Sequence, residues 1–371
     1  MTNFLYLIWN VDPDIITLFS RPIRWYGILF VLGFLIGQWI ILWMLKKEAP
    51  EGDSFKKRAE KDVETLTIYL VLATIIGARL GHVLFYEPDK YLKNPLDILK
   101  IWEGGLASHG AAIALLFILW IFARKRANWT WLKIVDRIVI VVALVGGLIR
   151  FGNFINSEIY GLPTGSEYGI VFTRNASEAI VRNSGLVNDV SYSKMTKSNE
   201  GNYVPIVINL TFKRGVDENQ MKTYIENHLP TILGGRYTYI SDHVLIDPEK
   251  PVAYTINGRE AHVNALGIPR HPTQLYESIT TFLLFLFLLS MWYRYKANTP
   301  PGRLIGLFLV ILFGLRFIHE FFKENQVSFE DNIPLNMGQW LSIPMIVFGL
   351  IILIHSFRHQ GTGSKPLPPH G

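Results

Sequence analysis

Apolar stretches of about 18 to 25 residues recur along this chain and restrict its fold more than any other feature of the sequence. A helix of roughly 20 apolar residues crosses a hydrocarbon layer about 30 Å thick. Within that layer every backbone polar group must find its hydrogen bond inside the protein, which a helix achieves by itself. Half of the residues are hydrophobic, in agreement with several such segments. The sequence therefore predicts an all-α polytopic membrane protein.

The apolar stretches predict seven transmembrane helices. We place them at about Trp25–Leu45, Val63–Tyr86, Ala111–Phe122, Ile134–Ile155, Thr273–Tyr293, Leu304–Phe322 and Met337–Ile354. Between the fourth and fifth of these the chain turns polar, and Val204–Phe212 and Tyr237–Ile246 predict strands there. The intervening Asp217–Leu233 predicts a helix. This polar stretch is therefore predicted to be a small α+β insertion.

The charge pattern predicts an orientation in the membrane. Lys and Arg gather after spans one, three and five and after span seven, whereas Glu324–Asn336 contains neither. Because basic loops favour the cytoplasmic side, the N-terminus and the insertion are expected outside and the C-terminus inside. The expected segments are 1–23 (N-terminal, interfacial), 24–159 (spans one to four), 160–270 (extracytoplasmic inserted head domain), 271–357 (spans five to seven) and 358–371 (cytoplasmic tail).

Composition excludes several classes of function. The formal net charge of +6 is no nucleic-acid signal, because the basic residues lie beside apolar runs rather than on one soluble face. The chain contains no cysteine, which excludes disulfides, thiolate metal sites and a cysteine nucleophile of its own. No pair of carboxylates has the spacing of a metal site, so neither a metal nor a cofactor is expected.

The costliest polar residues lie in Gly146–Gly161, at the end of the fourth predicted span. A charge at bilayer depth costs at least ~2.5–3.5 kcal/mol, so such residues usually face a cavity, a partner or a ligand. At about 100° per residue, Arg150, Asn153 and Ser157 fall within roughly 60° of one another on one helix face. An alternative is structural: the arginine ends the helix and the asparagines bind neighbouring helices.

Polar residues near the outer ends of other predicted spans share this depth. They are Tyr26, Arg79, His82, His109, His271, Gln274, Tyr276, Glu277, Arg316 and Glu320. Arg79, Arg150 and Arg316 would suit a phosphate or carboxylate in a low-dielectric site, and nearby glycines would let lipid chains approach. We therefore expect a lipid phosphate head group there. A structural ion-pair network, such as Arg150 with Glu158 or Arg316 with Glu320, is the competing interpretation.

The segment Gly147–Gly161 resembles the signature of the prolipoprotein diacylglyceryl transferase family, which is close to G-x-x-R-x-G-N-F-x-N-x-E-x-x-G. The resemblance continues through every predicted span in Arg24–Gly27, Gly77–Gly81, Trp102–Gly105 with His109-Gly110, His271–Glu277, Arg316 with Glu320, and Met337–Gln339. Two features depart from it. The family usually has a tyrosine where this chain has Leu312, so that hydroxyl is dispensable or supplied by another residue such as Tyr276. The insertion is also longer than the family's outer head.

The resemblance implies a transferase of the bacterial inner membrane. It would move the diacylglyceryl group of phosphatidylglycerol to the lipobox cysteine thiol of a preprolipoprotein, giving a thioether and glycerol phosphate, as the first step of lipoprotein maturation. The substrate would bring the cysteine that this chain lacks. Partners would be phosphatidylglycerol, preprolipoproteins and membrane lipids, without nucleic acid. The preferred preproteins and the oligomeric state stay open.

Carried over by position and combined with the residue chemistry, the resemblance predicts the site. The catalytic residues would be His109, Arg150 and Arg316, and the head group would contact Arg150, Asn153, Glu158, Gly161, Tyr26, Arg79 and Glu320. The arginines would hold the phosphate, with Arg316 at the leaving oxygen, while Asn153 and Glu158 position them. A histidine titrates near pH 6.5, so His109 is the candidate base; it would otherwise cap a helix.

Two other functions are weighed against this one. A transporter or flippase for an anionic lipid would also line a membrane cavity with arginines, but transporters commonly repeat their spans internally and this chain shows no such repeat. A metal-dependent phosphatidyl alcohol transferase would need aspartates on adjacent helix turns, and no predicted span contains such a cluster.

Overall fold

The computed structural model describes residues 6–358 except 19–20, 50–51, 102–103, 127–128, 196–201, 235–242, 248–249 and 325–333. The chain divides into two compact units. The helical unit comprises Leu29–Leu148, Ile279–Phe317 and Met337–Gly371, and the mixed unit comprises Met1–Ile28, Ile149–Ser278 and Ile318–Asn336. Several long helices therefore contribute residues to both units.

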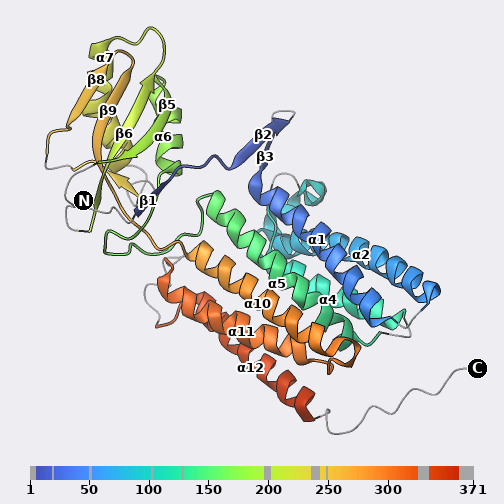
Figure 1. The fold of residues 1–371 in the computed structure, drawn as a ribbon. Coiled ribbons are helices and arrows are strands. Elements are labelled where there is room, and N and C mark those ends of the chain that lie inside the picture. The colour runs from blue at the N-terminus through green and yellow to red at the C-terminus, as the bar shows by residue number, and fades with distance from the viewer. Residues whose placement is uncertain are drawn as a thin grey trace, which may run out of the picture. The chain divides into compact units, whose positions relative to one another are not determined.

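Long apolar helices dominate the helical unit (Figure 1). They are α1 (Trp25–Glu48), α2 (Asp53–Phe85), α4 (Ser108–Arg124), α5 (Trp131–Ile155), α10 (Thr273–Tyr295), α11 (Arg303–His319) and α12 (Met337–Arg358). In the described chain, six helices are long and apolar enough to cross a membrane, and α4 is a shorter apolar helix of 17 residues. The protein is thus a polytopic membrane protein, with a helix over each predicted span.

One helix boundary differs clearly from prediction. Helix α2 begins at Asp53 rather than near Val63, because Lys56–Lys61 in the intervening segment consists of Lys, Arg, Ala and Glu, all good helix formers. Its Ala59 and Asp62 are buried, so these polar turns pack within the helical unit. Short α3 (Pro88–Lys93) and the 3₁₀ helix η1 (Pro95–Leu99) follow α2, and η4 (Lys296–Asn298) follows α10.

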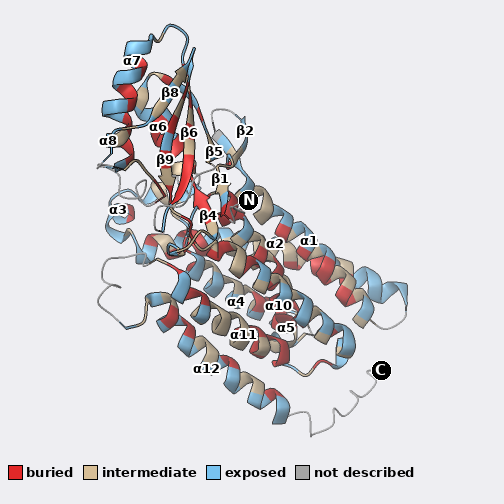
Figure 2. Cartoon of the chain, turned by 60° about the vertical axis from the view of Figure 1, so that its left-hand side comes forward, coloured by how far each residue is buried: buried red, intermediate tan, exposed pale blue. Residues whose placement is uncertain are grey.

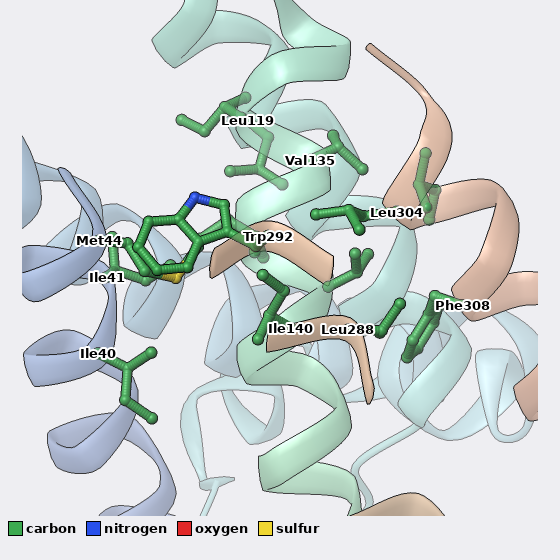
Figure 3. Packing of buried hydrophobic residues seen from close by; sticks show 14 of the residues in the cluster. Ile40, Ile41, Met44, Leu119, Val135, Ile140, Leu288, Trp292, Leu304 and Phe308 are labelled. Atoms are coloured by element: carbon green, nitrogen blue, oxygen red, sulfur yellow. The ribbon is translucent and has the colours of Figure 1, made fainter. Parts of the chain in front are cut away.

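The apolar core of the helical unit joins α1, α2, α4, α5, α10 and α11. Trp292 of α10 is its largest fully buried side chain. Figure 3 shows its indole close to Met44 of α1, with Ile140 of α5 and Leu288 in the same cluster. Helix α12 differs from this core, because many of its apolar side chains are exposed, as the pale blue in Figure 2 shows. Such exposure is the pattern of a lipid-facing helix.

Charged side chains are buried at one end of this core. Arg137 of α5 pairs with Glu48 of α1 at 3.0 Å, and the Trp292 indole N–H donates to the same carboxylate at 2.5 Å. The adjacent Asp136 accepts the backbone N–H groups of Gly302 and Ile305, at the start of α11. These charges therefore tie α1, α5, α10 and α11 together. The sequence drew attention to none of these contacts.

Glycines bring α2 and α4 into backbone contact. A Cβ on Gly81 would lie 2.7 Å from the Gly110 Cα, and one on Gly77 would lie 2.7 Å from the Gly110 carbonyl oxygen. Such separations exclude any side chain larger than hydrogen. The glycines near His109 thus serve helix packing in the helical unit.

The mixed unit contains the strands (Figure 1). They are β1 (Tyr6–Trp9), β2 (Asp14–Leu18), β3 (Arg21–Arg24), β4 (Gly169–Phe172), β5 (Val187–Lys194), β6 (Val204–Phe212), β7 (Val244–Leu245), β8 (Tyr254–Asn257) and β9 (Glu260–Gly267). The main antiparallel sheet has the order β5-β6-β9-β7, and β8 also pairs with β9. Strand β1 pairs in parallel with β4, so the N-terminal segment shares a unit with the predicted insertion.

Helices of the mixed unit pack against the sheet. They are α6 (Arg174–Ser184), α7 (Glu218–Thr223), the π-helical turn η3 (Tyr224–His228) and α8 (Leu229–Gly234). Alternate residues of β6, such as Ile206 and Ile208, are fully buried with Ile180 of α6 in one apolar cluster. Figure 2 shows β6 largely red, as a central strand should be.

The predicted elements of the insertion are found with one exception. The strand Val204–Phe212 is confirmed to the residue, and Asp217–Leu233 is helical throughout α7, η3 and α8, with Asp217 capping α7. Of the predicted strand Tyr237–Ile246, residues 237–242 lie outside the described residues, and β7 is a strand of two residues.

The mixed unit contains a buried histidine, His243. His243 is 1% exposed, and its ring meets Tyr160 edge-on with centroids 4.3 Å apart. Burial and the nearby Arg270 lower the pKa of His243 to about 3. The folded protein therefore keeps this imidazole neutral, whereas the unfolded chain protonates it below pH 6.5.

Replacing His243 by phenylalanine is expected to reduce acid sensitivity. Since its folded pKa is depressed, the stability that His243 contributes is complete above pH 6.5 and is lost as the pH falls toward 3. Between pH 7 and pH 5 the wild type should lose about 2 kcal/mol more than His243→Phe. Thermal melting of the detergent-solubilised proteins at both pH values measures this difference. Equal losses in the two proteins would contradict it.

Candidate active site

The chain leaves α5 in the mixed unit through a turn built around Glu158. Asn153 Nδ2 donates to Glu158 Oε1 at 2.7 Å, and the Glu158 backbone N–H donates to the Asn153 carbonyl at 3.1 Å. Gln274 Nε2 of α10 donates to the Glu158 carbonyl at 2.7 Å. Ser157 and Ile159 adopt positive φ values of 53° and 58°, an uncommon conformation that is strained for a β-branched residue. Strain held by such a bonded turn is typical of a functional segment.

A buried network of alternating charges lies in the same unit. Arg150 Nε pairs with Glu277 Oε2 at 2.8 Å. Lys323 Nζ contacts the other oxygen of Glu277 at 2.5 Å and Glu320 Oε1 at 3.1 Å. Cations and carboxylates thus alternate along Arg150, Glu277, Lys323 and Glu320.

Gly161 lies where three chain segments meet. Its N–H donates to the His271 carbonyl at 2.9 Å, and its carbonyl accepts from Arg270 Nη1 at 2.9 Å. A Cβ here would lie 2.5 Å from the Phe322 carbonyl oxygen and 2.7 Å from that of His271. Gly161 therefore fixes the backbone beside Lys323, instead of offering a side chain or free backbone group to a ligand.

Tyr26 packs against the helix that carries Arg150. A Cβ on Gly152 would lie 3.1 Å from the Tyr26 ring carbon Cδ2 and 3.2 Å from its Cα. Gly152 thus allows Tyr26 to lie directly on α5, between the turns of Arg150 and Asn153. Tyr26 belongs to the mixed unit together with this turn.

Arg79 of the helical unit holds a loop. Its guanidinium donates to the carbonyls of Asp97, Ile98, Lys100, Gly104 and Gly105 at 2.6 to 3.3 Å. A guanidinium has five N–H donors, so these five acceptors use them all. The predicted contact of Arg79 with a head group is therefore not supported, because no donor is left for a phosphate.

The other predicted residues of the helical unit are His109 and Arg316. His109 lies in the first turn of α4, exposed, with Phe85 and Tyr86 edge-on or tilted at ring-centroid distances of 5.1 and 5.8 Å. Arg316 is half-buried on α11. Leu312, one turn earlier, packs against the apolar core, so the position where the family usually has tyrosine is filled by apolar packing here.

Among the predicted residues, six belong to the mixed unit, namely Tyr26, Arg150, Asn153, Glu158, Gly161 and Glu320. The competing interpretation named Arg150 with Glu158 as an ion pair, but the structure pairs Arg150 with Glu277. Lys323 was missed, whereas Gln274 and Glu277 were named among the polar residues at this depth but not among the head-group contacts. The signal for Lys323 was its spacing of three residues from Glu320, which a span boundary at Phe322 concealed. In the described chain, no three His, Asp or Glu side chains are grouped as metal ligands would be.

A family profile described as prolipoprotein diacylglyceryl transferase matches residues 13–355. The chain belongs to the prolipoprotein diacylglyceryl transferase family. Its relatives in that family cover almost its whole length. The phosphatidylglycerol--prolipoprotein diacylglyceryl transferase of Tolumonas auensis is 32% identical over 354 residues, 95% of this chain and 99% of the relative.

Two further members of the prolipoprotein diacylglyceryl transferase family are equally similar. The enzyme of the same name from Chloroherpeton thalassium is 31% identical, over 96% of this chain and 97% of its own length. That from Porphyromonas gingivalis is 32% identical, over 98% and 99%. Both alignments run nearly end to end in this chain and in the relative.

Proposed function

We propose that this protein transfers the diacylglyceryl group of phosphatidylglycerol to the lipobox cysteine thiol of preprolipoproteins, the first step of lipoprotein maturation. The observation that carries the proposal is the family match over residues 13–355, which includes every residue of the mixed-unit charge network. The reaction forms a sulfur–carbon bond and breaks the carbon–oxygen bond to the phosphate. That oxygen keeps the electron pair and leaves as glycerol phosphate.

Arginine would stabilise the leaving group in this reaction. A phosphodiester monoanion gains charge as it becomes a phosphomonoester, so a guanidinium at that oxygen binds the transition state more strongly than the ground state. Arg150 is the cation of the mixed-unit network that we assign to the phosphate. Arg316, whose position matches the family pattern, is the cation that we assign to the leaving oxygen.

His109 is the proposed base for the substrate thiol. A thiol with a pKa near 8.5 is mostly protonated at neutral pH and gains nucleophilicity when an imidazole removes its proton. His109 is exposed at the start of α4, where a substrate can reach it. The alternative role, packing against Phe85 and Tyr86, would leave the chemistry unchanged.

Replacing His109 by alanine is therefore expected to slow transfer more at pH 7 than at pH 9, where the thiol ionises without help. A fall of about 10²-fold at pH 7 would match the usual contribution of a general base. Initial rates with a lipobox peptide across this range measure the effect. A loss that is the same at every pH would make His109 a packing residue.

The membrane arrangement is also part of the proposal. We assign seven crossings, including α4, whose 17 residues rise about 26 Å, in the bacterial inner membrane. The N-terminus and mixed unit would face outward and the C-terminus the cytoplasm, as the basic loops require. The N-terminal hairpin β2–β3, with exposed Ile16 and Leu18, would lie at the interface. The insertion would contact incoming preproteins.

The direct test uses the purified full-length protein, phosphatidylglycerol and a lipobox peptide, with mass spectrometry of the product. A peptide heavier by one diacylglyceryl group is expected, and the same peptide with serine for cysteine should stay unmodified. Activity is expected to survive a chelator. No adduct with a peptide that a known family member modifies would overturn the proposal.

A further inference from the structure

Three buried side-chain carbonyls of the mixed unit, those of Asn153, Asn156 and Gln274, lack a hydrogen-bond partner among the described residues. Two of them, Asn153 Oδ1 and Gln274 Oε1, belong to residues that are only 5% and 1% exposed. An unpaired acceptor at such depth costs about 1–3 kcal/mol, and folded proteins leave few of them. Two together in a candidate active site point to a ligand that brings hydrogen-bond donors.

The orientation of both amides is fixed by Glu158. Gln274 Nε2 donates to the Glu158 backbone carbonyl, and Asn153 Nδ2 donates to the Glu158 carboxylate, each at 2.7 Å. Both partners can only accept, so each amide must turn its NH₂ group toward Glu158. Neither amide can therefore flip, and the carbonyl oxygen of each stays on the side away from its contact with Glu158.

These acceptors lie one helical turn from the cation of the site. Arg150 precedes Asn153 by three residues on α5, and Gln274 precedes Glu277 by three on α10, so each pair shares a helix face. The Arg150–Glu277 ion pair joins the two faces at one level, and the Gln274–Glu158 bond joins them at the next. Arg150, a cation that can bind an anion, therefore lies one helical turn from two acceptors that can bind hydrogen-bond donors.

We propose that Gln274 and Asn153 accept the hydroxyl protons of the glycerol in the phosphatidylglycerol head group and so set head-group specificity. The inference rests on the proposed function and deepens it. Phosphatidylglycerol presents two free hydroxyls beside its phosphodiester. The phosphodiester would match Arg150, and the hydroxyls would match the two acceptors. A peptide backbone also has N–H donors, but it carries no anion for Arg150, so the lipid is the better match.

The experiment compares two lipid donors with the same acyl chains in the full-length enzyme. One is phosphatidylglycerol and the other is phosphatidylpropanol, which has the same phosphodiester without head-group hydroxyls. We expect the wild type to favour phosphatidylglycerol in kcat/KM by about 30-fold or more, because the analogue leaves two buried acceptors unpaired. Gln274→Met, which removes the acceptor at similar length, should lower that preference below about 5-fold.

A second variant separates recognition from structure. Gln274→Glu keeps an acceptor oxygen but loses the NH₂ that binds Glu158, so it should retain much of the head-group preference even where total activity falls. Equal use of both lipids by the wild type would overturn the inference. So would a Gln274→Met variant that loses activity toward both lipids equally, or one altered only in its KM for the peptide. No adduct from either lipid would instead overturn the proposed function itself.

Discussion

Replacing Arg150 with alanine is expected to lower kcat/KM for diacylglyceryl transfer by a factor on the order of 10²–10³, as loss of one group that stabilises a developing charge usually does. Arg150 Nε lies 2.8 Å from Glu277 Oε2, an ion pair that restrains the guanidinium, and we expect the terminal NH₂ groups to bind the phosphate. Without it, Glu277 loses one of its cations and the network gains net negative charge. Peptide adduct formation measured by mass spectrometry gives the rate.

Two matched variants test the reason for that loss. Arg150→Lys keeps a charge but cannot both bind Glu277 through Nε and present a planar fork, so about a tenfold loss is expected. Arg294→Ala removes an exposed arginine near the end of α10 and should leave the rate unchanged. Full activity of Arg150→Ala, with unaltered thermal melting, would remove Arg150 from the site.

The largest effect on stability is expected at Arg137. Its guanidinium is buried with Glu48, and it also donates to the backbone carbonyls of Lys133 and Lys296. Arg137→Met would leave the Glu48 carboxylate buried without its cation, which costs about 3–5 kcal/mol. The apparent melting temperature of the solubilised protein should fall by several degrees. Tryptophan fluorescence follows this directly, because Trp292 bonds to the same carboxylate.

A double variant tests whether the lost stability comes from the missing ion pair or from a carboxylate left buried without its cation. Glu48→Leu with Arg137→Met removes both charges, and it should recover much of the lost stability because an apolar pair can replace a buried ion pair. Lys46→Ala breaks the exposed Lys46–Glu60 pair and should cost less than about 1 kcal/mol. If the double variant melts as low as Arg137→Met alone, the hydrogen bonds to Lys133 and Lys296 would be the stabilising element instead.

The helices could be predicted because their signals are local. An apolar run such as Met337–Ile354 identifies its helix by length alone, and α12 begins at that first residue. The alternating pattern of Val204–Phe212 identified β6 in the same way. Charged turns at the start of α2 and the short strands before α1 were missed, since their apolar content does not distinguish them from loops.

The site could be predicted only in part, because the type of a residue does not reveal which groups it will contact in the fold. Arg79 and Arg150 looked alike in the sequence, each a single arginine in an apolar helix. The structure gives Arg79 five backbone carbonyls and Arg150 one carboxylate, so only the second can still bind a phosphate. Gln274 had no separate signal, because an unpaired carbonyl becomes visible only once its neighbours are in place.

The membrane class, the approximate helix positions and the family motif around Arg150 follow from the amino-acid order, because each depends on residues close together in the chain. Which charges meet depends on the packed fold: Arg150 pairs with Glu277 across more than a hundred residues, and Glu277 in turn with Lys323. This is because the energy of a buried charge depends on its contacts and not on its position in the chain. Those contacts form only when distant segments pack together.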